Sequence, residues 1–371
     1  MKILIAGDFC PQERVSAAFN QGDYQAVLGE IRPLLEESDF SMVNFECPIT
    51  KGGEKPISKL GLNLQCAENG MEAVKWVGFD CVTLANNHFY DFGEEGVVNT
   101  LEACRKHELY TVGGGTNKTE AAKTLYKQIN GQTLAVINCC EHEFSIATEK
   151  TGGSNPLNPI QQYYAIQEAR DNADFILVVV HGGHEYFQLP SPRMVETYRF
   201  FIDAGADAVV NHHQHCYSGY ELYQGKPIFY GLGNFCFDEV NDLGRIWNEG
   251  YLLKLIFSKE SIGFEIFPYE QCAEKPILKL LPQDVFQENI QQLNTIIKSP
   301  EKLQLETSKY YKESMRGINN ILNPTRNRFL FALQNRGYLP SPQKKPWLLK
   351  MQNYILCESH RDKMEYYFFN K

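Results

Sequence analysis

Short apolar runs alternate with amphipathic segments along the first 240 residues of the chain. Seven runs have the length and composition of β-strands, at residues 2–8, 39–46, 79–87, 133–140, 174–182, 206–213 and 226–235. Helices are predicted between several of them, at residues 23–37, 68–77, 94–107, 160–171 and 192–204. Strands that alternate with helices pair in parallel through crossovers, so the pattern predicts an α/β sheet. Residues 250–258 and 262–270 instead predict an antiparallel hairpin added to that sheet.

The pattern changes near residue 272. Residues 283–298 and 301–321 are polar and compatible with helices, and an aromatic, basic stretch punctuated by prolines follows them. We therefore expect an α/β domain at residues 1–272 and a C-terminal, mainly helical appendage at residues 273–371. The appendage carries a net charge of +7 and the rest of the chain −16. Two explanations stay open: two differently charged surfaces, or a basic region that docks on an anionic partner or makes peripheral contact with a membrane.

Composition narrows the class of protein. With 43% hydrophobic and 22% charged residues, a chain of 371 residues can bury a full core. We expect no membrane span, because no apolar run reaches the roughly 18 residues that one requires, and the N-terminus reads as a first strand. Eleven cysteines without a CxxC pair indicate a reducing compartment, so a cytoplasmic location is expected. The net charge of −9 argues against nucleic-acid binding. The oligomeric state stays open.

Polar residues stand at the points where the predicted strands end. They carry carboxylate, amide and imidazole groups, at Asp8, Asn44, Glu46, Asn86, Asn87, His88, His181, His213, His215 and Asn234. In open α/β sheets, ligands bind beyond the carboxyl ends of the strands. Oxygen and nitrogen donors without thiolate suit Mn, Fe or Zn, so the set predicts a divalent metal site. Taken singly, Asp8 can instead cap a turn, and the asparagines can occupy left-handed turn positions.

Three of the nine histidines lie within residues 212–215. His213 and His215 are two positions apart. In an extended segment alternate side chains point the same way, so both rings are expected to face one pocket. His212 would then point to the opposite side, as a structural group or as support for a ligand.

A series of motifs carries a resemblance to a known family. The motifs are GD at 7–8, NFECPIT at 44–50, ANNHFYDFGEEGVVNTL at 85–101, GGGTN at 113–117, HGGHEYFQLPSP at 181–192 and AGADAVVNHHQHCYSGYELYQGKPIFYGLGNFCFD at 204–238. Their order resembles the CapA (poly-γ-glutamate capsule biosynthesis) proteins over about residues 1–240. That family is related to the calcineurin-like metallophosphoesterases. The resemblance implies a four-layer α/β/β/α sandwich with a metal centre at the strand ends.

The metallophosphoesterase pattern comprises D-x-H, GD-xx-D, GNH-[DE], a lone histidine after a strand, and GH-x-H. The resemblance implies a set of metal ligands drawn from Asp8, Glu46, Asn87, His181, His213 and His215, and makes His88 a general acid or transition-state donor. Three departures matter. Cys10 stands where a ligand histidine is usual, Asn44 and Glu46 replace the bridging aspartate, and Phe89 follows the third motif, with Asp91 two residues later. We therefore expect one or two divalent ions.

These residues predict a metal-dependent hydrolase linked to capsule or poly-γ-glutamate type polymer synthesis. Its substrate would be a phosphoester, or an amide or ester in a polyanionic polymer. Glu185 would orient a ligand histidine or act as a base, and Arg14 would pair with a substrate anion through two parallel hydrogen bonds. Substrate contacts are expected from Asn44, Asn86, Asp91, His184 and Asn234.

Two alternatives to an enzyme stay open. The first is a non-catalytic polymer-binding or assembly and export factor, in which the basic C-terminal region matters most. The second is a structural or vestigial metal site without turnover. Relatives often begin with a membrane anchor, which this sequence lacks, so a soluble cytoplasmic variant is expected.

Overall fold

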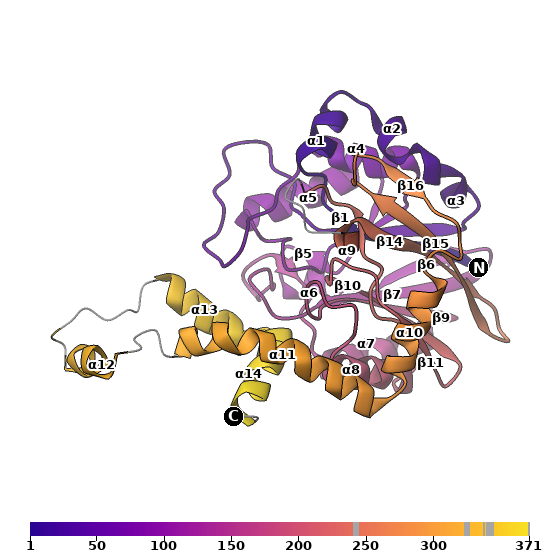
Figure 1. Ribbon diagram of the computed structural model, residues 1–371. Coiled ribbons are helices and arrows are strands. Elements are labelled where there is room, and N and C mark those ends of the chain that lie inside the picture. Colours follow the sequence, from indigo (N-terminus) through magenta and orange to yellow (C-terminus); the bar gives the residue numbers. More distant parts are fainter. Residues whose placement is uncertain (240–244, 323–326, 337, 339–344, 370–371) are drawn as a thin grey trace.

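The computed structural model describes residues 1–239, 245–322, 327–336, 338 and 345–369. Its core is built from two large β-sheets packed face to face (Figure 1). A small two-stranded sheet of β5 (Gly114–Gly115) and β8 (Gly153–Ser154) lies beside them.

The first large sheet has eight strands in the order β16-β15-β14-β1-β2-β3-β4, and β13 also pairs with β1. The strands are β1 (Lys2–Phe9), β2 (Phe40–Phe45), β3 (Cys81–Thr83), β4 (Tyr110–Val112), β13 (Asn234–Cys236), β14 (Glu249–Phe257), β15 (Ile262–Gln271) and β16 (Leu278–Leu280). β1 to β4 run parallel, as predicted. β14 and β15 form the predicted antiparallel hairpin, which joins the sheet beside β1.

The second large sheet has six strands in the order β11-β12-β10-β9-β7-β6. The strands are β6 (Leu125–Ile129), β7 (Gln132–Cys140), β9 (Phe175–His181), β10 (Ala208–His212), β11 (Tyr220–Tyr223) and β12 (Lys226–Phe229). The four central strands are parallel, and β11 and β6 are antiparallel edges. The single strand predicted at 226–235 is wrong: it is two strands, β12 and β13, which belong to different sheets. The chain crosses between the sheets at residues 230–233.

Alternation along β1 shows how the layers are assembled. Ile3 and Ile5 join the core between the two sheets, whereas Leu4 and Ala6 face the outer helices. Both sides are therefore buried, which explains why the central strands are apolar without interruption. The helices on the eight-stranded sheet are α1 (Glu13–Asn20), α2 (Tyr24–Leu28), the 3₁₀ turn η1 (Gly29–Ile31), α3 (Arg32–Glu36), α4 (Glu68–Val77) and α5 (Gly93–Lys106).

Two helices cover the outer face of the six-stranded sheet, α7 (Pro159–Asn172) and α8 (Pro192–Asp203). The layers can be followed in Figure 1 from α1 to α4 at the top to α7 and α8 at the bottom. The four-layer α/β/β/α arrangement implied by the resemblance is confirmed. Two short helices, α6 (Lys118–Ala121) and α9 (Arg245–Asn248), lie in the connections.

The C-terminal region is helical, but the helices begin later than predicted. β16 pairs with β15, so the boundary expected near residue 272 falls inside the eight-stranded sheet. The helices are α10 (Gln287–Ile297), α11 (Pro300–Leu322), α12 (Arg328–Asn335), α13 (Lys345–Leu356) and α14 (Glu358–Phe369). α10 packs on β11, and α11 packs on α8 and α14 (Figure 1). Across the described ranges, none of the helices combines the length and the apolar character of a membrane span.

Candidate metal centre

The strand ends of both sheets meet, and they bring the predicted polar residues together. In one sheet Asp8 of β1 pairs in register with Asn44 of β2, and in the other His212 of β10 pairs with His181 of β9. These residues are buried. Because parallel strands end at the same edge, two adjacent strands in each sheet deliver a polar group to one place.

Two groups of buried side chains have the geometry of metal ligands. The first contains Glu46, His181 and His213, and the second contains Asp8, Glu46 and His215. Within each group, one candidate ligand atom per residue lies within 4.8 Å of the others. Glu46 is common to both groups, so ions held by the two groups would share its carboxylate.

Glu46 is the least compensated charge in this cluster. It is fully buried, and neither carboxylate oxygen has a hydrogen-bond partner among the described residues. Its Oε1 lies 3.6 Å from Nε2 of His181 and 3.8 Å from Nε2 of His215. Burial, and then the neighbouring carboxylate of Asp8, raises the pKa of Glu46 well above its ordinary value. A buried carboxylate without donors is costly unless a cation compensates it, so the site fits a divalent metal.

The imidazoles around Glu46 have the protonation state that metals require. Burial and then the proximity of His213 lower the pKa of His181 well below its ordinary value. Burial also lowers the pKa of His213 to about 4. Both rings are therefore neutral near pH 7, which is the form that binds a cation. Nε2 of His181 lies 3.1 Å from Nδ1 of His213. The same nitrogen lies 3.0 Å from Oδ1 of Asn87.

Two asparagines that were predicted to touch substrate instead lie behind the ligands. Asn44 donates from Nδ2 to Oδ1 of Asp8 at 2.7 Å and lies 3.2 Å from Nδ1 of His181. Asn234 places Oδ1 2.9 Å from Nδ1 of His215. Both asparagines are fully buried. Such contacts orient a ligand and select the ring nitrogen that faces the ion, so the two asparagines support the candidate ligands.

The backbone of the histidine segment differs from the predicted extended form. β10 ends at His212, and His213 and His215 have φ angles of 91° and 54°, in the left-handed region. Residues other than glycine adopt such angles at a cost of roughly 1–3 kcal/mol, and they concentrate at functional sites. Both rings face Glu46 as predicted, but through a turn and not through strand alternation. His212 does not point away from the site, because its Nδ1 lies 3.6 Å from Oδ1 of Asp8.

His88 belongs to a second polar group, beside the ligands. Its Nδ1 lies 2.7 Å from Oδ2 of Asp91 and 3.0 Å from Nζ of Lys59, and Lys59 also pairs with Asp91. Burial, followed by the charge of Lys59, lowers the pKa of His88, and Asp91 partly opposes this shift. Asp91 was predicted to touch substrate, but it is fully buried and holds the His88 ring.

Sequence reasoning missed Lys59. It lies in a stretch without helix or strand, at residues 51–65, and no local motif marks it. Asn86, another predicted substrate contact, is fully buried. Its side chain donates to the carbonyl of Phe45 and accepts from the backbone N–H of His88. Asn86 therefore shapes the turn that presents His88.

Comparison with known proteins identifies the family. A model of the family described as "Bacterial capsule synthesis protein PGA_cap" matches residues 2–239. The chain belongs to this family. The capsule biosynthesis protein CapA of Bacillus anthracis is 34% identical over 247 residues, which are 64% of this chain and 60% of that protein. The PGA biosynthesis protein CapA of Bacillus subtilis strain 168 is 30% identical over 279 residues, 74% of this chain and 73% of that protein. The CapA resemblance read from the motifs is confirmed.

Solved structures resemble the fold more distantly. A 5'-nucleotidase precursor from Thermus thermophilus is 11% identical, with a TM-score of 0.44, and the match covers 79% of this chain and 57% of that one. A 5'-nucleotidase from Candida albicans is also 11% identical, with a TM-score of 0.43, covering 86% of this chain and 57% of that one.

The PGA_cap match contains every candidate ligand at the strand ends, and it also contains Arg14, which the structure places in an ion pair within the protein. The guanidinium of Arg14 forms a two-pronged pair with Asp238, with Nη2 2.6 Å from Oδ1. It also donates to the carbonyls of Cys272 and Glu274. These contacts use the donors of Arg14 and fasten α1 to the segment after β15, whereas the predicted pairing with a substrate anion stays a prediction.

Beyond the PGA_cap match, the C-terminal helices reach the mouth of the centre. His184, predicted to touch substrate, is buried with Nε2 3.0 Å from the hydroxyl of Tyr311 on α11. The side chain of Glu185 is exposed, and Tyr310 of α11 donates to its backbone carbonyl. Desolvation favours a higher pKa for Glu185, but the imidazoles of His213 and His215 lower the pKa below its ordinary value. Glu185 is therefore a carboxylate at the entrance.

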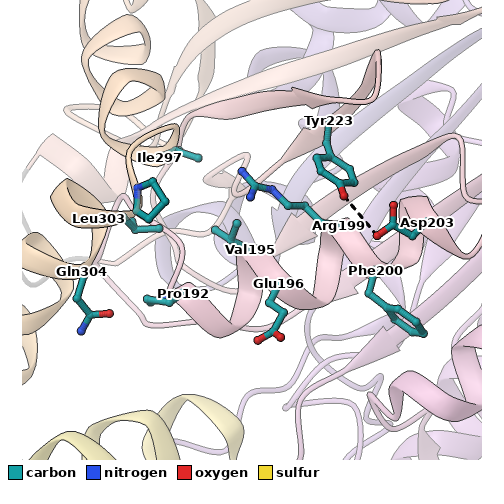
Figure 2. Close-up of a pocket in the computed structure, with 11 residues that line it drawn as sticks. Pro192, Val195, Glu196, Arg199, Phe200, Asp203, Tyr223, Ile297, Leu303 and Gln304 are labelled. Carbon is teal, nitrogen blue, oxygen red and sulfur yellow. Dashed lines mark hydrogen bonds between the residues drawn. The ribbon is translucent and has the colours of Figure 1, made fainter.

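A separate groove of about 550 Å³ lies between α8 and the junction of α10 and α11. Figure 2 shows its lining, which includes Arg199, Tyr223 and Leu303. None of its lining residues is a strand-end ligand, so the groove is distinct from the metal centre.

Proposed function

We propose that this PGA_cap protein is a metal-dependent hydrolase that acts in the synthesis of a capsule or poly-γ-glutamate type polymer. One observation carries the proposal: the buried carboxylate of Glu46 has no hydrogen-bond donor among the described residues and is flanked by His181 and His215. A structural core gains nothing from such a group, whereas a cation stabilises it.

The ligands divide into two sets that share Glu46. Asp8 and His215 would hold one ion, and His181, His213 and Asn87 would hold the other. Carboxylate, amide and imidazole donors favour Mn, Fe or Zn. When bound, such an ion supplies Lewis acidity, which polarises the scissile bond and makes nearby water a stronger nucleophile.

His88 is the proton donor in this proposal. Nδ1 of His88 lies 3.0 Å from Nζ of Lys59, and when it accepts from that ammonium the single proton of the neutral ring is on Nε2, from which it would pass to a leaving group. Lys59 fixes Asp91 from the other side and compensates its buried charge. The chain thus positions one imidazole beside the ligands through a buried carboxylate, without using that carboxylate in the reaction.

The names of the relatives support a substrate from polymer synthesis. The two Bacillus relatives are named for capsule and PGA biosynthesis. The substrate would be a phosphoester, or an amide or ester within a polyanionic polymer. The carboxylate of Glu185 would repel an anionic polymer. A bound cation would offset this repulsion, so the polymer would reach the strand ends only in the metal-bound protein.

Metal analysis combined with turnover tests the proposal. Purified wild-type protein should contain tightly bound Mn, Fe or Zn, and His213→Ala should lower that content. Hydrolysis of a generic phosphodiester and of a γ-glutamyl oligopeptide should require the metal and His88. Glu36→Gln is the control, because Glu36 lies on the surface of α3 and pairs with Arg32. Unchanged metal content in His213→Ala would overturn the metal centre.

A second candidate function is binding without turnover. The candidate ligands are at most 6% exposed, and α11 and α14 lie over the neighbouring loop. This burial favours an assembly factor in which the metal is structural. Metal that is retained without hydrolysis of either substrate class would support the second function and refute the first.

A further inference from the structure

A separate group of potential metal ligands lies where the C-terminal helices meet the core. It contains Glu143, in the loop after β7, Cys357, between α13 and α14, and His360, in the first turn of α14. One ligand atom of each lies within 4.8 Å of the others, and Sγ of Cys357 is 3.5 Å from Oε1 of Glu143. None of the three belongs to the strand-end groups.

The residues beside these three lock the junction together. His142 binds Glu358 at 2.7 Å, and the backbone N–H of Ser359 donates to Oε2 of Glu141 at 3.1 Å. Further along α14, Asp362 pairs with Arg193 of α8. One neighbour of each ligand, His142, Glu358 or Ser359, is therefore held by a contact across the junction. The ligands are held together without a metal, which lowers the cost of forming a site.

The donors at this junction are incompletely satisfied. Nδ1 of His360 is buried and has no hydrogen-bond partner among the described residues. Cys357 is 1% exposed, and its thiol contacts Glu143 and Ser359. The ring of His360 packs on Tyr354, but packing does not use its Nδ1, and this nitrogen forms a set of metal donors with the Cys357 thiol and the Glu143 carboxylate.

We propose that Glu143, Cys357 and His360 form a second metal site, which takes Zn²⁺ and fastens the C-terminal helices over the strand-end centre. Thiolate and imidazole with one carboxylate match the donor preference of Zn²⁺, in contrast to the strand-end groups, which contain no thiolate. Three protein ligands leave a fourth tetrahedral position for water.

The second site also touches the strand-end centre through one side chain. Oε2 of Glu143 accepts a hydrogen bond from Nδ2 of Asn87 at 3.1 Å, and Oδ1 of Asn87 faces His181. A cation on Glu143 would thus hold the amide of Asn87 with its oxygen toward the strand-end ligands. Cys357 and His360 lie beyond the PGA_cap match, which ends at residue 239.

Cobalt substitution of the full-length protein distinguishes the two sites. Co²⁺ bound by a thiolate gives a charge-transfer band in the near ultraviolet, which oxygen and nitrogen ligands do not give. The band should appear in the wild type and in His213→Ala, and it should be absent from Cys357→Ser. Zinc content should fall by one ion per chain in Cys357→Ser and in His360→Ala, but not in the control Glu36→Gln on the surface of α3.

Several results would overturn the second site. The first is a thiolate band that survives in Cys357→Ser, which ligation by Cys10 would produce. The second is cobalt binding without any thiolate band. The third is unchanged zinc content in His360→Ala. If Cys357→Ser does not fold, the loss of one zinc ion per chain in His360→Ala still tests the site. The result is independent of the proposed hydrolase, because His213→Ala removes the strand-end centre and should leave the thiolate band in place.

Discussion

Replacing Glu46 with glutamine should affect stability in opposite directions without and with metal. In the metal-free protein the raised pKa means that the native state holds a proton that the unfolded chain releases. Native stability should therefore fall as pH rises above about 4.3, the ordinary value for glutamate. Glutamine cannot ionise, so metal-free Glu46→Gln should lose less stability on going to pH 7 and should equal or exceed the wild type there.

With metal the order should reverse. An ion at 100 times its Kd stabilises the native state by about 2.7 kcal/mol. For a chain larger than 250 residues, at about 2 °C per kcal/mol, this is a rise in Tm of about 5 °C. Thermal unfolding with EDTA and with Mn²⁺, at pH 5 and pH 7, measures both effects. Glu36→Gln, on the surface of α3, is the control. A metal-induced rise in Glu46→Gln equal to that of the wild type would refute the reasoning.

Three further variants test Arg14 as a structural contact, Asn234 as the support of a ligand histidine, and His88 as the proton donor. Arg14→Ala leaves the buried carboxylate of Asp238 without its partner, so chemical denaturation should show a loss of about 2 kcal/mol while metal content stays unchanged. Asn234→Ala removes the oxygen beside Nδ1 of His215, so calorimetry should show metal binding weakened about 10- to 100-fold. If Asn234 contacts only the substrate, metal affinity should stay nearly unchanged. His88→Gln should lower kcat by about 10²- to 10⁴-fold with full metal content, and equal turnover would exclude His88 as the proton donor.

Strand periodicity was sufficient to predict most of the centre. β1, β2, β9 and β10 are apolar runs: β1 ends one residue after Asp8, β2 ends just before Glu46, and β9 and β10 each end at a histidine. The rule that parallel strands end at one edge then places Asp8, Asn44 and His181 together. The split of residues 226–235 between two sheets was not predicted, because the hydrophobic pattern of a buried strand is the same whichever sheet it joins. Gly233 (φ 84°) lies in the crossing, and an added Cβ would meet the carbonyl of Glu249 at 2.7 Å.

Roles that depend on distant partners could not be predicted from local pattern. In the sequence, Arg14 looks like a free cation near the first strand. In the structure it pairs with Asp238, which lies 224 residues away along the chain. His184 reads as a strand-end histidine until Tyr311 covers it from α11. Lys59 carries no motif at all, because its position depends on a loop without regular structure. In each case the deciding contact joins segments that the sequence shows only as separate.

The end of the PGA_cap match is not the end of the structural unit that holds the ligands. β14 lies beside β1, with Leu253 and Leu255 in register with Ile5 and Ile3, so the strand that carries Asp8 has a neighbour from beyond residue 239. α10 adds a further contact, because Oδ1 of Asn294 accepts from the backbone N–H of Tyr220. The ligands come from the matched region, whereas part of the support of β1 comes from residues after it. A change after residue 239 can therefore affect the strand-end site without touching a ligand.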